Sequence, residues 1–103
     1  MSRFRIAHPS TDDICAYAGT DHAIGPFCEI FTEDRIAPIA SVDVFELGRP
    51  ATLDDIFELL MEFAFFSEEE LREALVYLQD GGREPRSRGV MRVVGIVERL
   101  RGE

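Results

Sequence analysis

The fold is decided by residues 52–80, which read TLDDIFELLMEFAFFSEEELREALVYLQD. Two helix starts lie within this stretch. Ser67 is followed three positions later by Glu70, which is the spacing of a capping box. In this motif the hydroxyl and the carboxylate each accept a hydrogen bond from a backbone N–H group at the start of a helix. Thr52 and Asp55 repeat this spacing, with Asp in place of the usual Glu. Each pair therefore predicts the beginning of a helix.

The ends of both predicted helices can also be read from the sequence. The first helix is expected over residues 53–65, where apolar residues recur without a break. The second begins after Ser67 and ends at Asp80-Gly81-Gly82, because glycine readily adopts the left-handed conformation that closes a helix.

Hydrophobic residues surround most of the first predicted helix. They fill an arc of about 260°, whereas an ordinary surface helix buries a stripe little more than about 100° wide. Such a helix needs cover on several sides, either from a second copy of the chain or from its own domain. We expect a homodimer, and its candidate interface consists of Phe57, Met61, Phe63, Phe65 and Phe66.

The remaining arc of the same helix is acidic. Asp54, Asp55, Glu58 and Glu62 fall within about 100° of one another. A solvated face is one interpretation of this stripe. The other is a docking surface for a basic protein partner, because opposite charges steer such encounters.

The N-terminal residues predict a strand followed by a helix. Arg3, Phe4, Arg5 and Ile6 alternate between charged and apolar, which is typical of a short strand over residues 3–7. The next residues, Pro9-Ser10-Thr11-Asp12-Asp13, place a hydroxyl before two acids, as at a helix N-terminus. A helix is therefore predicted from there to Gly19, with a loop over residues 20–26.

The middle and the end of the chain complete the fold class. Residues 27–33 and 36–46 predict two strands joined at Asp34-Arg35. Residues 89–101 have apolar side chains at helical spacing and predict a helix, with a buried strand as the alternative because many of them are β-branched. Strands followed by helices indicate an α+β fold, a small antiparallel sheet with three to four helices packed against it, as one domain over residues 1–103.

Charge and composition exclude several classes of function. The 103 residues carry a formal net charge of −9, and all eleven basic residues are arginine. A chain without lysine has no P-loop lysine and no Schiff-base site. Only the two ends of the chain have a basic excess, so we expect no nucleic-acid binding through the acidic central body.

The expected location and cofactor content are inferred from apolar stretches, cysteine number and motifs. No apolar stretch reaches the ~20 residues that a membrane span needs, and none follows the N-terminal arginines as in a signal peptide. Two cysteines are too few for a disulfide framework, so the cytoplasm is the expected location. No sequence motif indicates a cofactor, and none is expected.

One cluster of residues supports a different function. His8, Asp21, His22 and Cys28 include both histidines and one of the two cysteines, and they could serve a small hydrolase or a metal-dependent enzyme. The spacing contains no pair of ligands from one tight turn and no nucleophile motif.

We therefore expect a small acidic binding or regulatory protein that acts as a homo-oligomer, of the kind that accessory genes of mobile elements encode. The enzyme is the alternative.

Overall fold

The computed structural model describes residues 2–102, and they form a four-stranded antiparallel sheet and four helices. The predicted α+β fold class is thus confirmed. The chain divides into two compact units, one that ends at Phe65 and one that begins at Phe66. The single domain expected from chain length stays a prediction, and the two units are described separately below.

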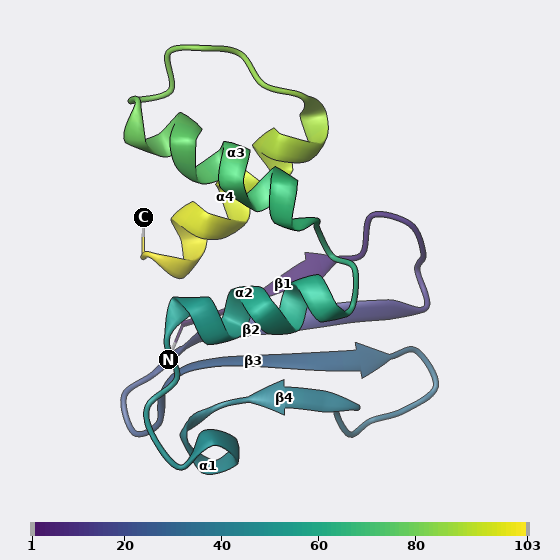
Figure 1. Ribbon diagram of the computed structural model, residues 1–103. Helices are drawn as coiled ribbons and strands as arrows, with labels where there is room; N and C mark the ends of the chain where they lie inside the picture. The colour runs from purple at the N-terminus through teal and green to yellow at the C-terminus, as the bar shows by residue number, and fades with distance from the viewer. Residues whose placement is uncertain (1, 103) are drawn as a thin grey trace. The chain divides into compact units, whose positions relative to one another are not determined.

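The first unit contains the whole sheet. Its strands are β1 (Ser2–Ala7), β2 (Ile14–Asp21), β3 (Gly25–Thr32) and β4 (Ala40–Val42), and they lie in the order β1-β2-β3-β4. Each strand therefore pairs with its neighbour in the chain, which Figure 1 shows as a simple meander. The strand predicted over residues 3–7 is confirmed, and so is the strand predicted at 27–33.

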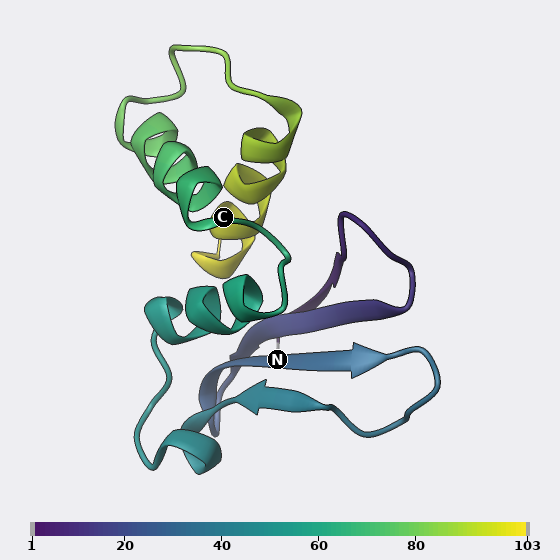
Figure 2. The same cartoon turned by 45° about the vertical axis from the view of Figure 1, so that its right-hand side comes forward.

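One face of this sheet is apolar. The register places Phe4 opposite Ala18, and Ala18 opposite Cys28, so the three side chains share a face. Ile6, Ala16 and Ile30 form the next row of the same face, and all six residues are buried. Helix α2 (Leu53–Glu62) contacts β3 and β4 and lies along the sheet in both ribbon views (Figures 1 and 2).

The helix predicted between Ser10 and Gly19 is wrong, because these residues form a turn and the strand β2. The hydroxyl of Thr11 accepts a hydrogen bond from the Asp13 N–H at 3.1 Å, which closes a local turn instead of capping a helix. The following residues then pair with β1 on one side and β3 on the other. The predicted loop over 20–26 is accordingly reduced to the turn at 22–24.

The strand predicted over residues 36–46 is also largely wrong. Only Ala40–Val42 are paired, and a short helix, α1 (Val44–Leu47), follows them. The Asp43 carboxylate accepts a hydrogen bond from the Glu46 N–H at 2.9 Å and starts this helix, and Gly48 ends it at φ 70°. Residues 33–39 form a loop in place of the expected two-residue turn.

Helix α2 begins and ends with well-defined caps. Both hydrogen bonds of the Thr52–Asp55 capping box are present. The helix ends at Glu62, three residues before the predicted end, and the Phe65 N–H then donates to the Leu60 carbonyl at 2.9 Å. This is the pattern of a Schellman motif, but its left-handed position is occupied by Ala64, at φ 61°.

The second unit is a helical pair. Helices α3 (Glu68–Gln79) and α4 (Arg88–Leu100) contact each other, and Ser67 and Ser87 cap their N-termini. The helix predicted over residues 89–101 is confirmed over its strand alternative, and its valines lie on the buried face. Within residues 2–102, no helix is long and apolar enough to cross a membrane.

Candidate functional site

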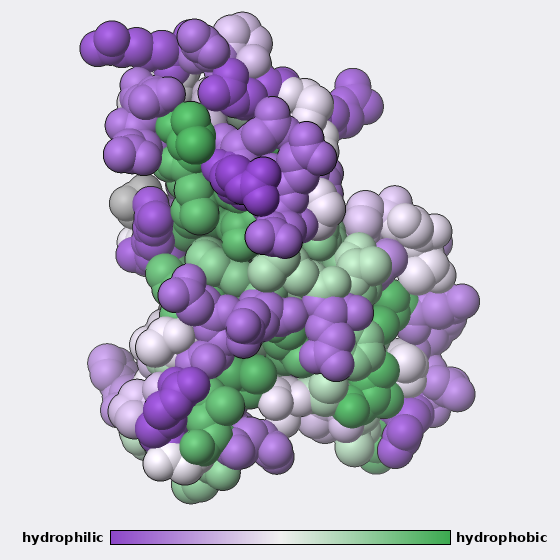
Figure 3. Space-filling view, in the orientation of Figure 1, coloured by the Kyte–Doolittle hydropathy of each residue, from purple (hydrophilic) through white to green (hydrophobic). Residues whose placement is uncertain are grey.

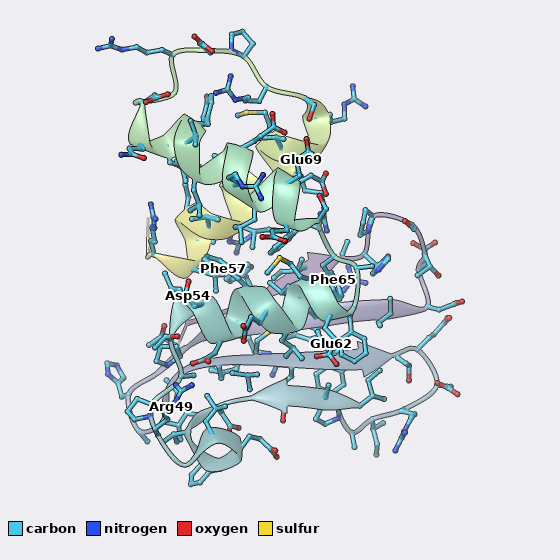
Figure 4. The ribbon with its side chains drawn as sticks, in the orientation of Figure 1. Arg49, Asp54, Phe57, Glu62, Phe65 and Glu69 are labelled. Carbon is cyan, nitrogen blue, oxygen red and sulfur yellow. The ribbon has the colours of Figure 1, made fainter. Side chains whose placement is uncertain are left out.

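Three carboxylates form a row along the exposed side of α2. Asp54, Glu58 and Glu62 are exposed and lie four residues apart, so each step rises about 6 Å along the helix. Figure 3 shows hydrophilic residues over this helix, and Figure 4 places Asp54 and Glu62 near its two ends. None of the three forms a salt bridge with another described residue, although Arg49 is close enough to Glu58 to be affected by its charge. We call these three residues the acidic row.

Asp55, the fourth member of the predicted stripe, has a structural role instead. Its side chain is only 13% exposed and binds both guanidinium nitrogens of Arg49, at 2.8 and 3.0 Å. The same carboxylate accepts hydrogen bonds from the N–H and the hydroxyl of Thr52. The Arg49 hydrogen bonds, followed by the Thr52 N–H, hold the pKa of Asp55 well below its ordinary value of 3.8. Asp55 is therefore neutralised within the chain and does not belong to the acidic row.

His8 has a structural role as well. The Ser10 N–H donates to Nδ1 at 3.1 Å, so the ring hydrogen is on Nε2, which donates to the Phe63 carbonyl at 2.9 Å. The imidazole ring also packs edge-on against Phe65, with ring centroids 4.9 Å apart. His8 thereby joins the end of β1 to the segment that follows α2.

The other residues proposed for an enzyme are separated from His8. Asp21 and His22 lie at the far end of β2, while His8 follows the β1 residue that pairs with its near end. The Asp21 carboxylate accepts the N–H groups of Ala23 and Ile24 and so holds the β2–β3 turn. His22 is exposed in that turn. The structure therefore does not bring a base and a nucleophile together at this end of the sheet.

Cys28 is enclosed in the core and is chemically quiet. Its side chain is fully buried, and burial, with a smaller contribution from Glu29, raises the pKa of the thiol to about 12. A thiol with so high a pKa carries almost no nucleophilic thiolate at neutral pH. Among residues 2–102, no three His, Cys, Asp or Glu side chains form a group that could hold a metal ion.

Three of the five residues of the predicted oligomer interface are buried, and the interface itself stays a prediction. Phe57, Phe65 and Phe66 are 5%, 0% and 4% exposed, so a second copy could gain little by covering them. Met61 and Phe63 are half-buried. The exposed large apolar side chains lie elsewhere, and the two most exposed are Ile36 and Phe45.

A second acidic surface lies at one end of the sheet. A shallow depression of about 410 Å³ is lined by Asp13, Thr32, Glu33 and Asp34. Its three carboxylates come from two different turns, unlike the regular spacing on α2. Because it contains three carboxylates, as the acidic row does, it can serve as a control surface of the same charge.

Sequence reasoning missed the residues that distinguish these roles. Arg49 precedes the helix that it stabilises, and its partner Asp55 lies six positions away, outside the spacing at which helix ion pairs are expected. The strand predicted over residues 36–46 contains both Ile36 and Phe45. Because alternate side chains of a strand are buried, the exposure of these two residues was not expected. The signal that could have exposed the error is Asp43-x-x-Glu46 followed by Gly48, which together mark a short helix.

Comparisons with protein-family models, with curated proteins and with solved structures gave no match to this chain.

Proposed function

We propose that this chain is a non-catalytic docking protein that acts as a homodimer and presents the acidic row of α2 to a basic surface on a protein partner. The observation that carries the proposal is the row itself. Asp54, Glu58 and Glu62 are exposed and form no salt bridge with another described residue, while the other faces of their helix are largely buried.

The stability of α2 accounts for Asp54, which lies in the first turn where the helix dipole favours an acid, but not for the rest of the row. Like charges four residues apart on a helix repel each other and cost a few tenths of a kcal/mol per pair. Glu62 also lies in the last turn, at the negative end of the helix dipole, and no basic residue is present there to offset it. A basic partner would relieve both penalties, which makes the row better suited to binding than to solvation alone.

Geometry weighs against the alternative of a hydrolase or metal-dependent enzyme. The residues proposed for it are divided between opposite ends of β2 and the core, and His8, Asp21 and Cys28 each have a structural role. Both cysteines are free thiols, which fits the cytoplasmic location that we propose. The exposed Ile36 and Phe45 support self-association.

The test uses a defined basic probe. An alanine-based helical peptide with arginine at every fourth position matches the spacing of the acidic row, and a peptide of the same composition with its arginines clustered at one end does not. We expect the spaced peptide to bind more tightly by isothermal titration calorimetry, with an affinity that falls as salt rises past about 0.15 M, where the screening length is about 8 Å.

Matched variants separate a specific site from general charge. The triple variant Asp54→Asn, Glu58→Gln, Glu62→Gln should weaken binding of the spaced peptide by about tenfold or more, since three charge contacts are lost. The control removes the same charge from the depression at the end of the sheet, by Asp13→Asn, Glu33→Gln and Asp34→Asn. Equal losses in the two variants, or equal binding of the two peptides, would refute the acidic row as the docking site.

A further inference from the structure

The strand β4 forms one edge of the sheet and pairs only with β3 among the described residues. It is three residues long, with the loop 33–39 at one end and α1 at the other (Figures 1 and 2). An edge strand leaves backbone N–H and C=O groups free on its outer side, and these can pair with another chain.

Each end of this edge carries an apolar side chain that nothing covers. Ile36, in the loop, is 101% exposed, and Phe45, on α1, is 79% exposed. The next most exposed large apolar residues, Val76 and Met91, reach only 40% and 37%. Both side chains would be buried together if a second chain covered this edge.

The charges beside these two residues are opposite in sign. Arg35 precedes Ile36, and Glu46 follows Phe45; both are exposed. Neither enters a salt bridge within the described part of the chain. Glu33 and Asp34 precede Arg35 in the same loop, so the opposite charges that can pair between the two ends are those of Arg35 and Glu46.

Such a surface fits a second copy of itself. A two-fold axis through Ser41, the central residue of β4, would pair the strand antiparallel with its own copy. Ile36 lies five positions before Ser41 and Phe45 four positions after it, so the rotation brings the Arg35–Ile36 end of one copy to the Phe45–Glu46 end of the other. We propose that the β4 edge is the homodimer interface, with Ile36 packed against the second copy's Phe45 and Arg35 paired with its Glu46.

This inference rests on the homodimer part of the proposed function and gives it a location. Two exposed phenylalanines and two exposed isoleucines, at about 150–250 Å² for each aromatic ring, supply less than the ~1,200–2,000 Å² of a standard stable interface. Contributions from the strand backbone and the flanking loop must supply the rest. We therefore expect a reversible dimer with a dissociation constant in the micromolar range.

The experiment is analytical ultracentrifugation of the full chain over a range of concentrations around that value. Ile36→Asp and Phe45→Asp should each raise the dissociation constant by at least about tenfold, since each removes a central apolar contact twice per dimer. The controls Val76→Asp and Met91→Asp introduce the same charge at exposed apolar positions of the second unit, outside β4 and its flanking segments, and should leave the dissociation constant unchanged. Circular dichroism of each variant checks that the fold is retained.

A charge exchange tests the pairing itself. Arg35→Glu and Glu46→Arg should each weaken the dimer, because each brings two like charges together. The double variant should restore the dimer, because residues 35 and 46 again carry opposite charges. A dimer that tolerates Ile36→Asp and Phe45→Asp, or a double variant weaker than both single ones, would overturn the β4 interface while leaving a homodimer in place. A monomer at every concentration would contradict the homodimer as well, and would not affect the peptide-binding result.

Discussion

At the scale of single residues, the side chains that look most reactive in the sequence serve the fold. His8 bonds to the Phe63 carbonyl, Asp21 holds a turn, and Cys28 is part of the core. Each residue type is equally suited to catalysis and to structure, so its role is decided by neighbours that are distant in the sequence. His8 and Phe63 are 55 positions apart, which no local pattern can reveal.

Ala64 carries a backbone penalty that a substitution can remove. It lies at φ 61°, where an L-residue other than glycine costs about 1–2 kcal/mol. We expect Ala64→Gly to raise the free energy of unfolding by about 1 kcal/mol, measured by urea denaturation, because glycine avoids this penalty. Glycine also increases the conformational entropy of the unfolded chain, which offsets part of this stabilisation.

Gly25 provides the opposite change as a control. It lies at φ 77°, and an added Cβ would meet no atom within 4 Å, so Gly25→Ala changes only the backbone penalty. This variant should be destabilised by about the same amount. If Ala64→Gly proved destabilising, the Schellman motif at the end of α2 would be wrong.

At the scale of elements, the helices α2, α3 and α4 and the strands β1 and β3 could be predicted, whereas α1 and β2 could not. The caps of α2 and α3 are local, since Thr52 and Ser67 each bond within three residues, and both were read correctly. The strand β2 was missed because its signal is long-range. Its alanines are poor strand formers, and pairing with β1 and β3 outweighs their preference.

The candidate site also depends on both local and long-range signals. Asp54, Glu58 and Glu62 could be predicted because helical spacing alone places them together. The separate role of Asp55 could not, because it depends on a bend of the chain that returns Arg49 to the start of α2. The burial of Phe57 and Phe65 could not be predicted either, because all-round apolarity does not reveal which chain provides the cover.

The start of α2 should make stability depend on acid pH. A carboxyl whose pKa is lowered by folding contributes stability that is present above its unfolded value, near 3.8, and lost as the pH falls toward the folded value. Urea denaturation at a series of pH values should therefore show Asp55→Asn well below the wild type at neutral pH, with the difference closing below about pH 4.

Asp54→Asn is the matched control for this experiment. It removes the same charge from the adjacent residue, which is exposed and forms no salt bridge among the described residues. Its pH profile should stay close to that of the wild type. A constant gap between Asp55→Asn and the wild type from neutral to acid pH would show that the charge of Asp55 has no part in capping.

Helices α3 and α4 approach each other closely at Gly89. A Cβ added to Gly89 would lie 2.5 Å from Oε2 of Glu70, the residue whose other oxygen accepts the Ser67 N–H in the capping box. Gly89→Ala should therefore cost about 1 kcal/mol by displacing this carboxylate, even though alanine is the better helix former.

A double-mutant cycle isolates this contact. In a Glu70→Ala background the clash is absent, and Gly89→Ala should become neutral or stabilising. If the cost of Gly89→Ala is the same in both backgrounds, the two helices do not approach each other at this point.

At the scale of the whole molecule, the charge is concentrated in one part of the chain. Residues 1–65 hold twelve acidic residues and four arginines, a net −8, whereas residues 66–103 hold eight acidic residues and seven arginines, a net −1. The first unit thus carries nearly all of the net charge, together with the acidic row and the β4 edge. A basic partner should be steered to this unit, because a field of one sign raises association rates.

If α2 presents the docking surface, the bound peptide should be found on this helix when its contacts are mapped onto the chain. In amide NMR spectra recorded during titration with the arginine-spaced helical peptide, we predict the largest shifts at Asp54, Glu58 and Glu62 and their neighbours on α2. Shifts centred on Asp13, Glu33 and Asp34, or spread evenly over all acidic residues, would mean that α2 is not the docking surface.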